Sequence, residues 1–164
     1  MNIFYLDSNP RTCAQYHCDK HVVKMILETA QMLSTAHHVL DGDDAIDGIY
    51  RSTHKNHPSS VWVRFCEGNY KWTWLLFMHL LAEYTKRYDN VHATERLLYT
   101  LKSTPKNIPR DVRTTEPPQC MPEQYKVKDA SMQAYRNYYI GEKATIAFWR
   151  HSDTPEWWSY EKAA

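Results

Sequence analysis

A long stretch without glycine or proline opens the chain, and it constrains the fold more than any other feature. The stretch runs from residue 11 to residue 41, between Pro10 and Gly42. Glycine and proline are the residues that most often end helices, so their absence over this length predicts a long helix. The whole chain of 164 residues holds only 4 glycines. This scarcity argues against a glycine-rich β-sandwich and against a glycine loop that binds phosphate.

The expected architecture is all-α. Asp7 or Ser8 is suited to cap the first helix, with Pro10 in its first turn, and Ser59 or Ser60 is suited to cap the second. We predict about four helices, of which the first two are long and the first is either continuous or broken once: residues 10–40, residues 59–88, residues 93–101, and a helix that begins near residue 129. Residues 2–6 read as a short strand or an extended arm. Five prolines make residues 104–123 a loop.

Composition indicates one compact domain over residues 1–164. Lys and Arg number 20 against 19 Asp and Glu, and 22 residues are aromatic (12 Tyr, 6 Trp and 4 Phe). A disordered chain would hold fewer aromatic residues and a more one-sided charge. The four cysteines are irregularly spaced and do not form a disulfide framework. With neither a signal peptide nor an apolar run long enough to span a membrane, we expect the protein in the cytoplasm.

Polar side chains form a narrow band on the first predicted helix. Steps of four and three residues put seven of them on one line: His17, His21, Lys24, Glu28, Gln31, Thr35 and His38. A solvated helix face is the usual explanation of such a band. Here it holds a single Lys and a single Glu, and these stand in the less favourable order for a surface ion pair. The band can therefore also be a site for acid–base chemistry or for a polar ligand.

A second polar cluster precedes the second predicted helix. Residues 53–58 read Thr-His-Lys-Asn-His-Pro, so His54, Lys55, Asn56 and His57 gather before a helix N-terminus. These side chains suit a phosphate or a base edge, although a polar loop organised around a turn has the same composition. Lys20 and the tail residue Trp158 are further candidates for phosphate contact and base stacking. Residues 85–113 carry a local charge of +4, which favours nucleic acid more than the net charge of the chain does.

A metal site is a weaker alternative. Cys13, His17 and His21 step by four, but the outer two lie about 12 Å apart along a helix and cannot both reach one Zn²⁺ ion. His17 with His21, or Cys18 with His21, could supply two ligands, and His54 or His57 could complete the set. Neither HExxH nor a pair of CxxC motifs occurs in the sequence. We therefore predict neither a metal nor another cofactor.

Two sequence blocks resemble a family of small proteins encoded by phages of marine bacteria. The blocks are residues 18–33 (CDKHVVKMILETAQML) and residues 53–58, followed by Val61 and Trp62. The chain is also similar to the phage-type pyrimidine dimer DNA glycosylases of the endonuclease V family. That similarity rests on Tyr70, residues 83–88 and the closing residues Pro155, Trp157, Trp158 and Tyr160.

The resemblance to the glycosylases implies a compact helical protein that acts on flipped or kinked damaged DNA. In that family the nucleophile is the α-amine of a threonine that is exposed when the initiator methionine is removed. Here residue 2 is Asn, so we expect Met1 to stay, and Val22 and Val23 stand nearest to the position of the family's catalytic glutamate. The chain therefore departs from the family at both catalytic positions.

These departures predict that another amine replaces the family's nucleophile. We expect Lys24 to be desolvated on a buried helix and to form a Schiff base, with Glu28 moving protons and His21 assisting. The sequence thus favours an enzyme of DNA bases or nucleotides, most concretely a DNA N-glycosylase/lyase. Two alternatives stay open: a protein that sequesters a host signalling nucleotide, and a structural protein whose polar band is merely solvated.

Overall fold

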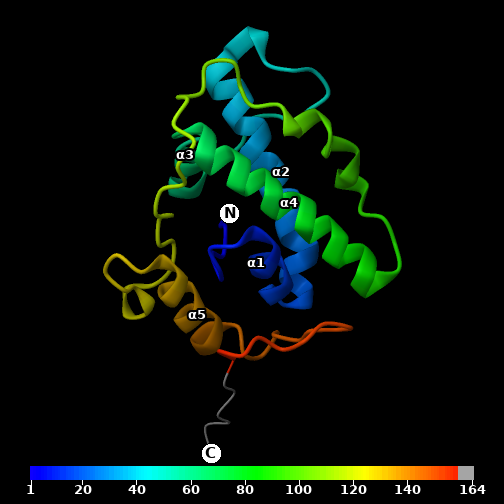
Figure 1. Cartoon of the computed structure of the whole chain (residues 1–164), viewed down its shortest axis with the longest axis vertical. Coiled ribbons are helices and arrows are strands. Elements are labelled where there is room, and N and C mark those ends of the chain that lie inside the picture. The colour runs from blue at the N-terminus through cyan, green and yellow to red at the C-terminus, as the bar shows by residue number, and fades with distance from the viewer. Residues whose placement is uncertain (159–164) are drawn as a thin grey trace, which may run out of the picture.

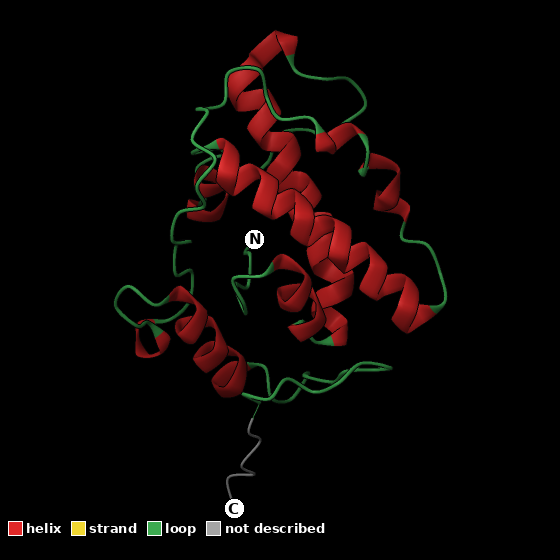
Figure 2. Cartoon of the chain, in the orientation of Figure 1, coloured by secondary structure: helices red, strands yellow, loops and turns green. Residues whose placement is uncertain are grey.

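The computed structural model describes residues 1–158, and Tyr160 of the aromatic tail lies outside this range. The described chain is helical without a strand, which confirms the all-α prediction (Figure 2). Residues 2–6 form an N-terminal arm that is neither helix nor strand, with a left-handed backbone at Phe4 (φ 51°), so the strand alternative is wrong. The α-helices of the described residues are α1 (Pro10–Tyr16), α2 (Asp19–Asp41), α3 (Pro58–Val63), α4 (Glu67–Tyr88) and α5 (Ser131–Glu142). Within the same range, no helix is long and apolar enough to cross a membrane.

The first predicted helix is broken once, at His17 and Cys18, whose backbones are extended. A buried arginine from α4 stabilises the break. The Arg87 guanidinium donates hydrogen bonds to the carbonyl oxygens of His17 (2.7 Å) and Gln15 (3.0 Å). It also pairs with Asp19 at 3.1 Å. Carbonyl groups that a continuous helix would satisfy internally are therefore satisfied by a side chain 70 residues away in sequence.

The prediction of one helix over residues 59–88 is wrong, because the chain forms two helices there, α3 and α4. The Asn69 side chain donates to the carbonyl oxygen of Trp62 (2.9 Å) near the end of α3. Gly68, in the first turn of α4, lies against the Pro-rich segment, where a Cβ atom would collide with the carbonyl oxygen of Arg113. The segment thus crosses the beginning of α4, where it accepts backbone hydrogen bonds from Glu67 and Gly68.

Several predicted boundaries differ from those of the structure. Asn9 caps α1 and His57 caps α3, because both side chains accept backbone N–H groups two residues ahead. The predicted helix at residues 93–101 consists of short 3₁₀ turns, Ala93–Leu97 and Thr100–Lys102. The predicted caps at residues 7–8 and 59–60 are therefore wrong.

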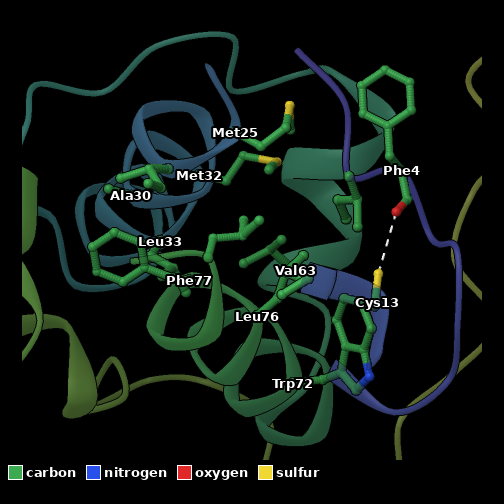
Figure 3. Packing of buried hydrophobic residues seen from close by; sticks show 14 of the residues in the cluster. Phe4, Cys13, Met25, Ala30, Met32, Leu33, Val63, Trp72, Leu76 and Phe77 are labelled. Carbon is green, nitrogen blue, oxygen red and sulfur yellow. Dashed lines mark hydrogen bonds between the residues drawn. The ribbon is translucent and has the colours of Figure 1, made fainter. Parts of the chain in front are cut away.

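The core lies where α2 crosses α4, with α1 packed beside them (Figure 1). Leu33 and Met32 of α2 face Leu76 and Phe77 of α4 in this buried cluster (Figure 3). The N-terminal arm joins the same core, since the Cys13 thiol donates to the carbonyl oxygen of Phe4 at 3.4 Å (Figure 3). The chain therefore begins inside the fold, and the N-terminus lies near the middle of the view in Figure 1.

Candidate active site

The first residues of the chain meet α2 at Glu28. One carboxylate oxygen, Oε2, lies 3.8 Å from the Met1 amine and accepts the Asn2 backbone N–H at 3.1 Å. The other oxygen, Oε1, lies 3.4 Å from Nζ of Lys24. The Glu28 side chain is only 13% exposed. A half-buried carboxylate thus contacts two amines, one from the chain terminus and one from the preceding turn of α2.

Side-chain contacts hold the Met1 amine at this place. The Met1 side chain is 2% exposed, and its sulfur accepts a hydrogen bond from the Ser60 hydroxyl of α3 at 3.4 Å. The Asn2 side chain donates to the carbonyl oxygen of Cys120 (2.9 Å) and lies 2.7 Å from the Tyr135 hydroxyl. The N-terminus is therefore fastened to α3, to α5 and to the loop between residues 115 and 120, which leaves its amine in a defined position.

His57 borders the same amine. Its Nδ1 atom accepts the backbone N–H of Ser59 at 3.2 Å, so the proton of the neutral ring is on Nε2. Burial lowers the pKa of His57, the nearby charges of the Met1 amine and His54 lower it further, and Glu28 opposes them. The ring is therefore neutral at neutral pH, with one N–H group to donate to a ligand.

The polar band of α2 is covered where residues 50–57 fold against it. The Thr35 hydroxyl donates a hydrogen bond to the backbone carbonyl oxygen of Thr53 and accepts one from the backbone N–H of Thr53, and each is 3.1 Å long. The His38 ring contacts the carbonyl oxygen of Tyr50 at 2.9 Å. These contacts rule out a merely solvated face at this end of the band. The side chains of His54, Lys55 and Asn56 in the same segment are exposed.

The two histidines at the start of the predicted band point into the interior. His21 stacks on Phe4 with ring centroids 4.3 Å apart and contacts the Tyr139 hydroxyl at 2.6 Å. Burial, followed by the charge of His17, lowers the pKa of His21 to about 3. His17 precedes α2 and is fully buried, and burial lowers its pKa to about 4. The prediction that these residues line one band with Lys24 is wrong. His17 lies in the break before α2, and His21, on the same helix as Lys24, is covered by Phe4 of the N-terminal arm and Tyr139 of α5.

The other predicted residues are scattered. The Lys24 side chain is 63% exposed, so the expectation that it is desolvated is wrong, although its amine does contact Glu28. Lys20 is exposed and Gln31 is half-buried on the same helix. Trp158 packs against Trp149 with ring centroids 5.0 Å apart, within an aromatic cluster of the C-terminal segment. The packing explanation of this tryptophan is therefore favoured.

Residues 1–158 contain no group of three or more His, Cys, Asp and Glu side chains that could hold a metal ion. The four cysteines are free thiols. Burial raises the pKa of Cys13 to about 12 and raises that of Cys18, so both stay protonated and are poor metal ligands.

Comparison with known proteins decides the family. A family model described as pyrimidine dimer DNA glycosylase matches residues 1–96, more than half of the chain. The chain belongs to this family. The matched part contains the Met1 amine, Glu28, His57 and α1 to α4, and it ends before α5. No curated protein and no solved structure matches the chain.

The family assignment changes how the N-terminus is interpreted. Val22 and Val23 stand nearest to the position expected for the family's glutamate, but in the structure Glu28 lies one helical turn beyond Lys24 and contacts the Met1 amine. Met1, Asn2 and Tyr135 were missed as site residues. No periodicity within one helix could have revealed them, because the contacts join the chain terminus to residues 26 to 133 positions away.

Proposed function

We propose that this protein is a DNA glycosylase/lyase that excises damaged pyrimidines and that the Met1 amine is its nucleophile. One observation carries the proposal: in a chain of the pyrimidine dimer DNA glycosylase family, a half-buried carboxylate lies 3.8 Å from the α-amine. An amine beside a carboxylate is the arrangement that imine formation requires, because the carboxylate takes the proton that the amine loses.

The contacts favour the α-amine over Lys24. The Met1 side chain is 2% exposed whereas the Lys24 side chain is 63% exposed, so the terminal amine is held in place and the lysine amine is free to move. As a class, α-amines have pKa values near 8 and lysine side chains near 10.4. At neutral pH a far larger fraction of α-amines is therefore unprotonated and nucleophilic. Lys24 would then serve as the cation on the second oxygen of Glu28.

The proposed reaction begins when the neutral amine attacks C1′ of the damaged nucleotide. The bond from the amine nitrogen to C1′ forms, the bond from C1′ to the base breaks, and the base leaves with the electron pair. Glu28 accepts the amine proton. The bond from C1′ to O4′ then opens, O4′ takes a proton, and a C1′ imine results, from which the strand is cleaved by elimination.

His57 and the exposed residues before α3 would bind the DNA backbone. The Nε2–H group of His57 can donate to a sugar or phosphate oxygen without a change of charge, and exposed Lys55 adds a cation for phosphate. His54 and Asn56 lie beside them and offer further polar contacts.

The test is borohydride trapping of the purified protein on ultraviolet-irradiated and untreated duplex DNA. The proposal predicts a covalent adduct on irradiated DNA only. Lys24→Arg keeps the charge but cannot form an imine, and it is expected to trap at nearly the wild-type rate. Loss of the adduct in this variant would assign the nucleophile to Lys24. Absence of any adduct with the wild type would refute the proposal and leave non-covalent nucleotide binding as the alternative.

A further inference from the structure

The Tyr135 hydroxyl of α5 belongs to a closed ring of hydrogen bonds around the second residue of the chain. The hydroxyl donates to Oδ1 of Asn2 at 2.7 Å and accepts the backbone N–H of Cys120 at 3.3 Å. The Asn2 side chain closes the ring, because its Nδ2 atom donates to the carbonyl oxygen of Cys120 at 2.9 Å. The carbonyl oxygen of Pro118, at 2.8 Å, is a second acceptor for the hydroxyl proton. The ring therefore joins the N-terminal arm to α5 and to the loop between residues 115 and 120.

The backbone of Asn2 connects this ring to the amine site. The Asn2 N–H donates to Oε2 of Glu28 at 3.1 Å, and the Met1 amine lies 3.8 Å from the same oxygen. Only the backbone of Met1 separates the two nitrogens, and the Met1 side chain is itself held at Ser60. The place of the amine beside the carboxylate therefore depends on where the Asn2 side chain is held.

The aromatic ring of Tyr135 contacts the N-terminal arm at a second point, Phe4. The two rings pack edge to face, with their centroids 6.0 Å apart. The Phe4 backbone is left-handed (φ 51°), a conformation that a bulky residue keeps only where the surrounding contacts enforce it. Tyr135, which is fully buried, supplies one of these contacts. It thus holds the arm at residue 2 through its hydroxyl and at residue 4 through its ring.

The Tyr135 hydroxyl is suited to hold a position and not to transfer a proton. Burial raises the pKa of this hydroxyl far above its ordinary value, so the group is neutral at any physiological pH. Its proton is directed at the oxygens of Asn2 and Pro118. A neutral, buried donor of this kind fixes the geometry of its partners without a change of charge.

We propose that Tyr135 is a positioning residue for the imine-forming step and that it acts through the Asn2 side chain. The inference rests on the proposed glycosylase function. It adds a residue of α5, a helix that follows the residues 1–96 matched by the family model. A misplacement of a reacting group by about 1 Å can slow a reaction about a hundredfold. The ring of hydrogen bonds keeps the Met1 amine from such a displacement.

The test uses Tyr135→Phe, which removes the hydroxyl and keeps the ring that packs against Phe4. Borohydride trapping on a duplex with a pyrimidine dimer is followed under single-turnover conditions at increasing protein concentration. The plateau gives the rate constant of imine formation, and the concentration at half of the plateau reports the affinity for DNA. We expect the rate constant to fall about ten- to a hundredfold while the affinity stays unchanged. A merely structural role would instead lower the melting temperature and the amount of protein that traps, with no change in the rate constant of the folded molecules.

Tyr70→Phe is the matched control. Tyr70 is also fully buried, and its hydroxyl also donates to a carbonyl oxygen of a connecting segment, that of Leu101, at 2.9 Å. This variant loses a comparable hydrogen bond away from Asn2, so it is expected to trap at the wild-type rate.

A second variant tests whether Tyr135 acts through Asn2. Asn2→Leu keeps the branched shape of the side chain and removes both of its hydrogen-bonding groups, and intact mass verifies that Met1 is present. It is expected to slow trapping about as much as Tyr135→Phe does. The double variant should be no slower than either single variant, because residues that act as one unit give effects that are not additive.

An unchanged rate constant in Tyr135→Phe, or a loss confined to DNA affinity, would overturn the positioning role and leave the glycosylase proposal intact. A double variant whose loss is the product of the two single losses would overturn it as well. If Tyr135→Phe does not fold, Asn2→Leu decides, since wild-type trapping by this variant would refute the role. A wild type that traps no irradiated DNA would refute the proposed function itself, and the positioning role with it.

Discussion

The contacts of Glu28 predict how its replacement by glutamine, its uncharged analogue, changes stability and activity. Glu28→Gln keeps the size of the side chain and an oxygen that accepts the Asn2 N–H, which lies 3.1 Å from the carboxylate. A hydrogen bond to a charged group contributes about 1.5–3 kcal/mol to stability, and a neutral one contributes about 0.5–1.5 kcal/mol. Replacing the carboxylate by an amide should therefore weaken the hydrogen bond from the Asn2 N–H by about 1 kcal/mol. The contact with Lys24, whose side chain is 63% exposed, adds little in water. The free energy of unfolding should therefore fall by only about 1–2 kcal/mol, and the protein stays folded.

The activity of this variant should fall much further. Loss of a group that moves protons in the transition state lowers rates by about 10²–10⁴-fold, and trapping on irradiated DNA measures this directly. The matched control is Glu67→Gln, since the Glu67 side chain is also 13% exposed and also pairs with a lysine four residues away, but at the beginning of α4. This control should trap at the wild-type rate. A Glu28→Gln protein that traps as fast as the wild type would refute the assignment of Glu28.

Three other predictions follow from the same contacts. Asparagine is a good N-cap residue, so the His57→Asn variant should melt close to the temperature of the wild type. Its borohydride trapping should slow about tenfold or more. Unchanged trapping would show that His57 is not part of the site. Because burial lowers the pKa of His17 to about 4 and that of His21 to about 3, the native protein binds fewer protons than the unfolded chain below pH 6.5. The contribution of these histidines to the free energy of unfolding should be constant above that pH. Below it, the free energy should fall by up to about 1.4 kcal/mol per pH unit for each histidine. A free energy of unfolding in urea that does not change from pH 7 to pH 5 would contradict their burial. Gly68→Ala should lower the free energy of unfolding by about 1–3 kcal/mol, because its Cβ meets the backbone of Arg113; an unchanged unfolding midpoint would show that the Pro-rich segment moves freely.

The helical architecture was predictable from the sequence because helix-breaking residues are scarce and polar residues recur at helical spacing. One break in the first helix was anticipated, but its place was not predictable, and the division of the second helix was not predicted at all. Arg87 and Asn69 stabilise them through contacts with distant carbonyl groups, and a local pattern carries no sign of such partners. The predicted third helix is wrong as well, since residues 93–101 form only short 3₁₀ turns.

The candidate site was predictable in part. Glu28 and His57 were singled out from the sequence, and the structure brings both side chains close to the Met1 amine. Their roles in a reaction stay predictions. His21 was misplaced because Phe4 of the N-terminal arm and Tyr139 of α5 cover it, and helical spacing carries no sign of these distant partners. Trp158 was misplaced because two adjacent tryptophans suit packing as well as stacking. The Met1 amine was discounted because residue 2 is Asn, and the structure instead brings that amine to a carboxylate.

The most direct test of the central claim is to identify the amine that forms the imine. Wild-type protein is trapped with borohydride on a duplex that contains a single pyrimidine dimer, and the adduct is digested and assigned by peptide mass spectrometry. Intact mass before the reaction defines the N-terminal residue of the protein used. We expect the modification on the α-amine of Met1, the group that lies 3.8 Å from Glu28. Modification of Lys24 or of any other lysine, with the terminal amine unmodified, would contradict it.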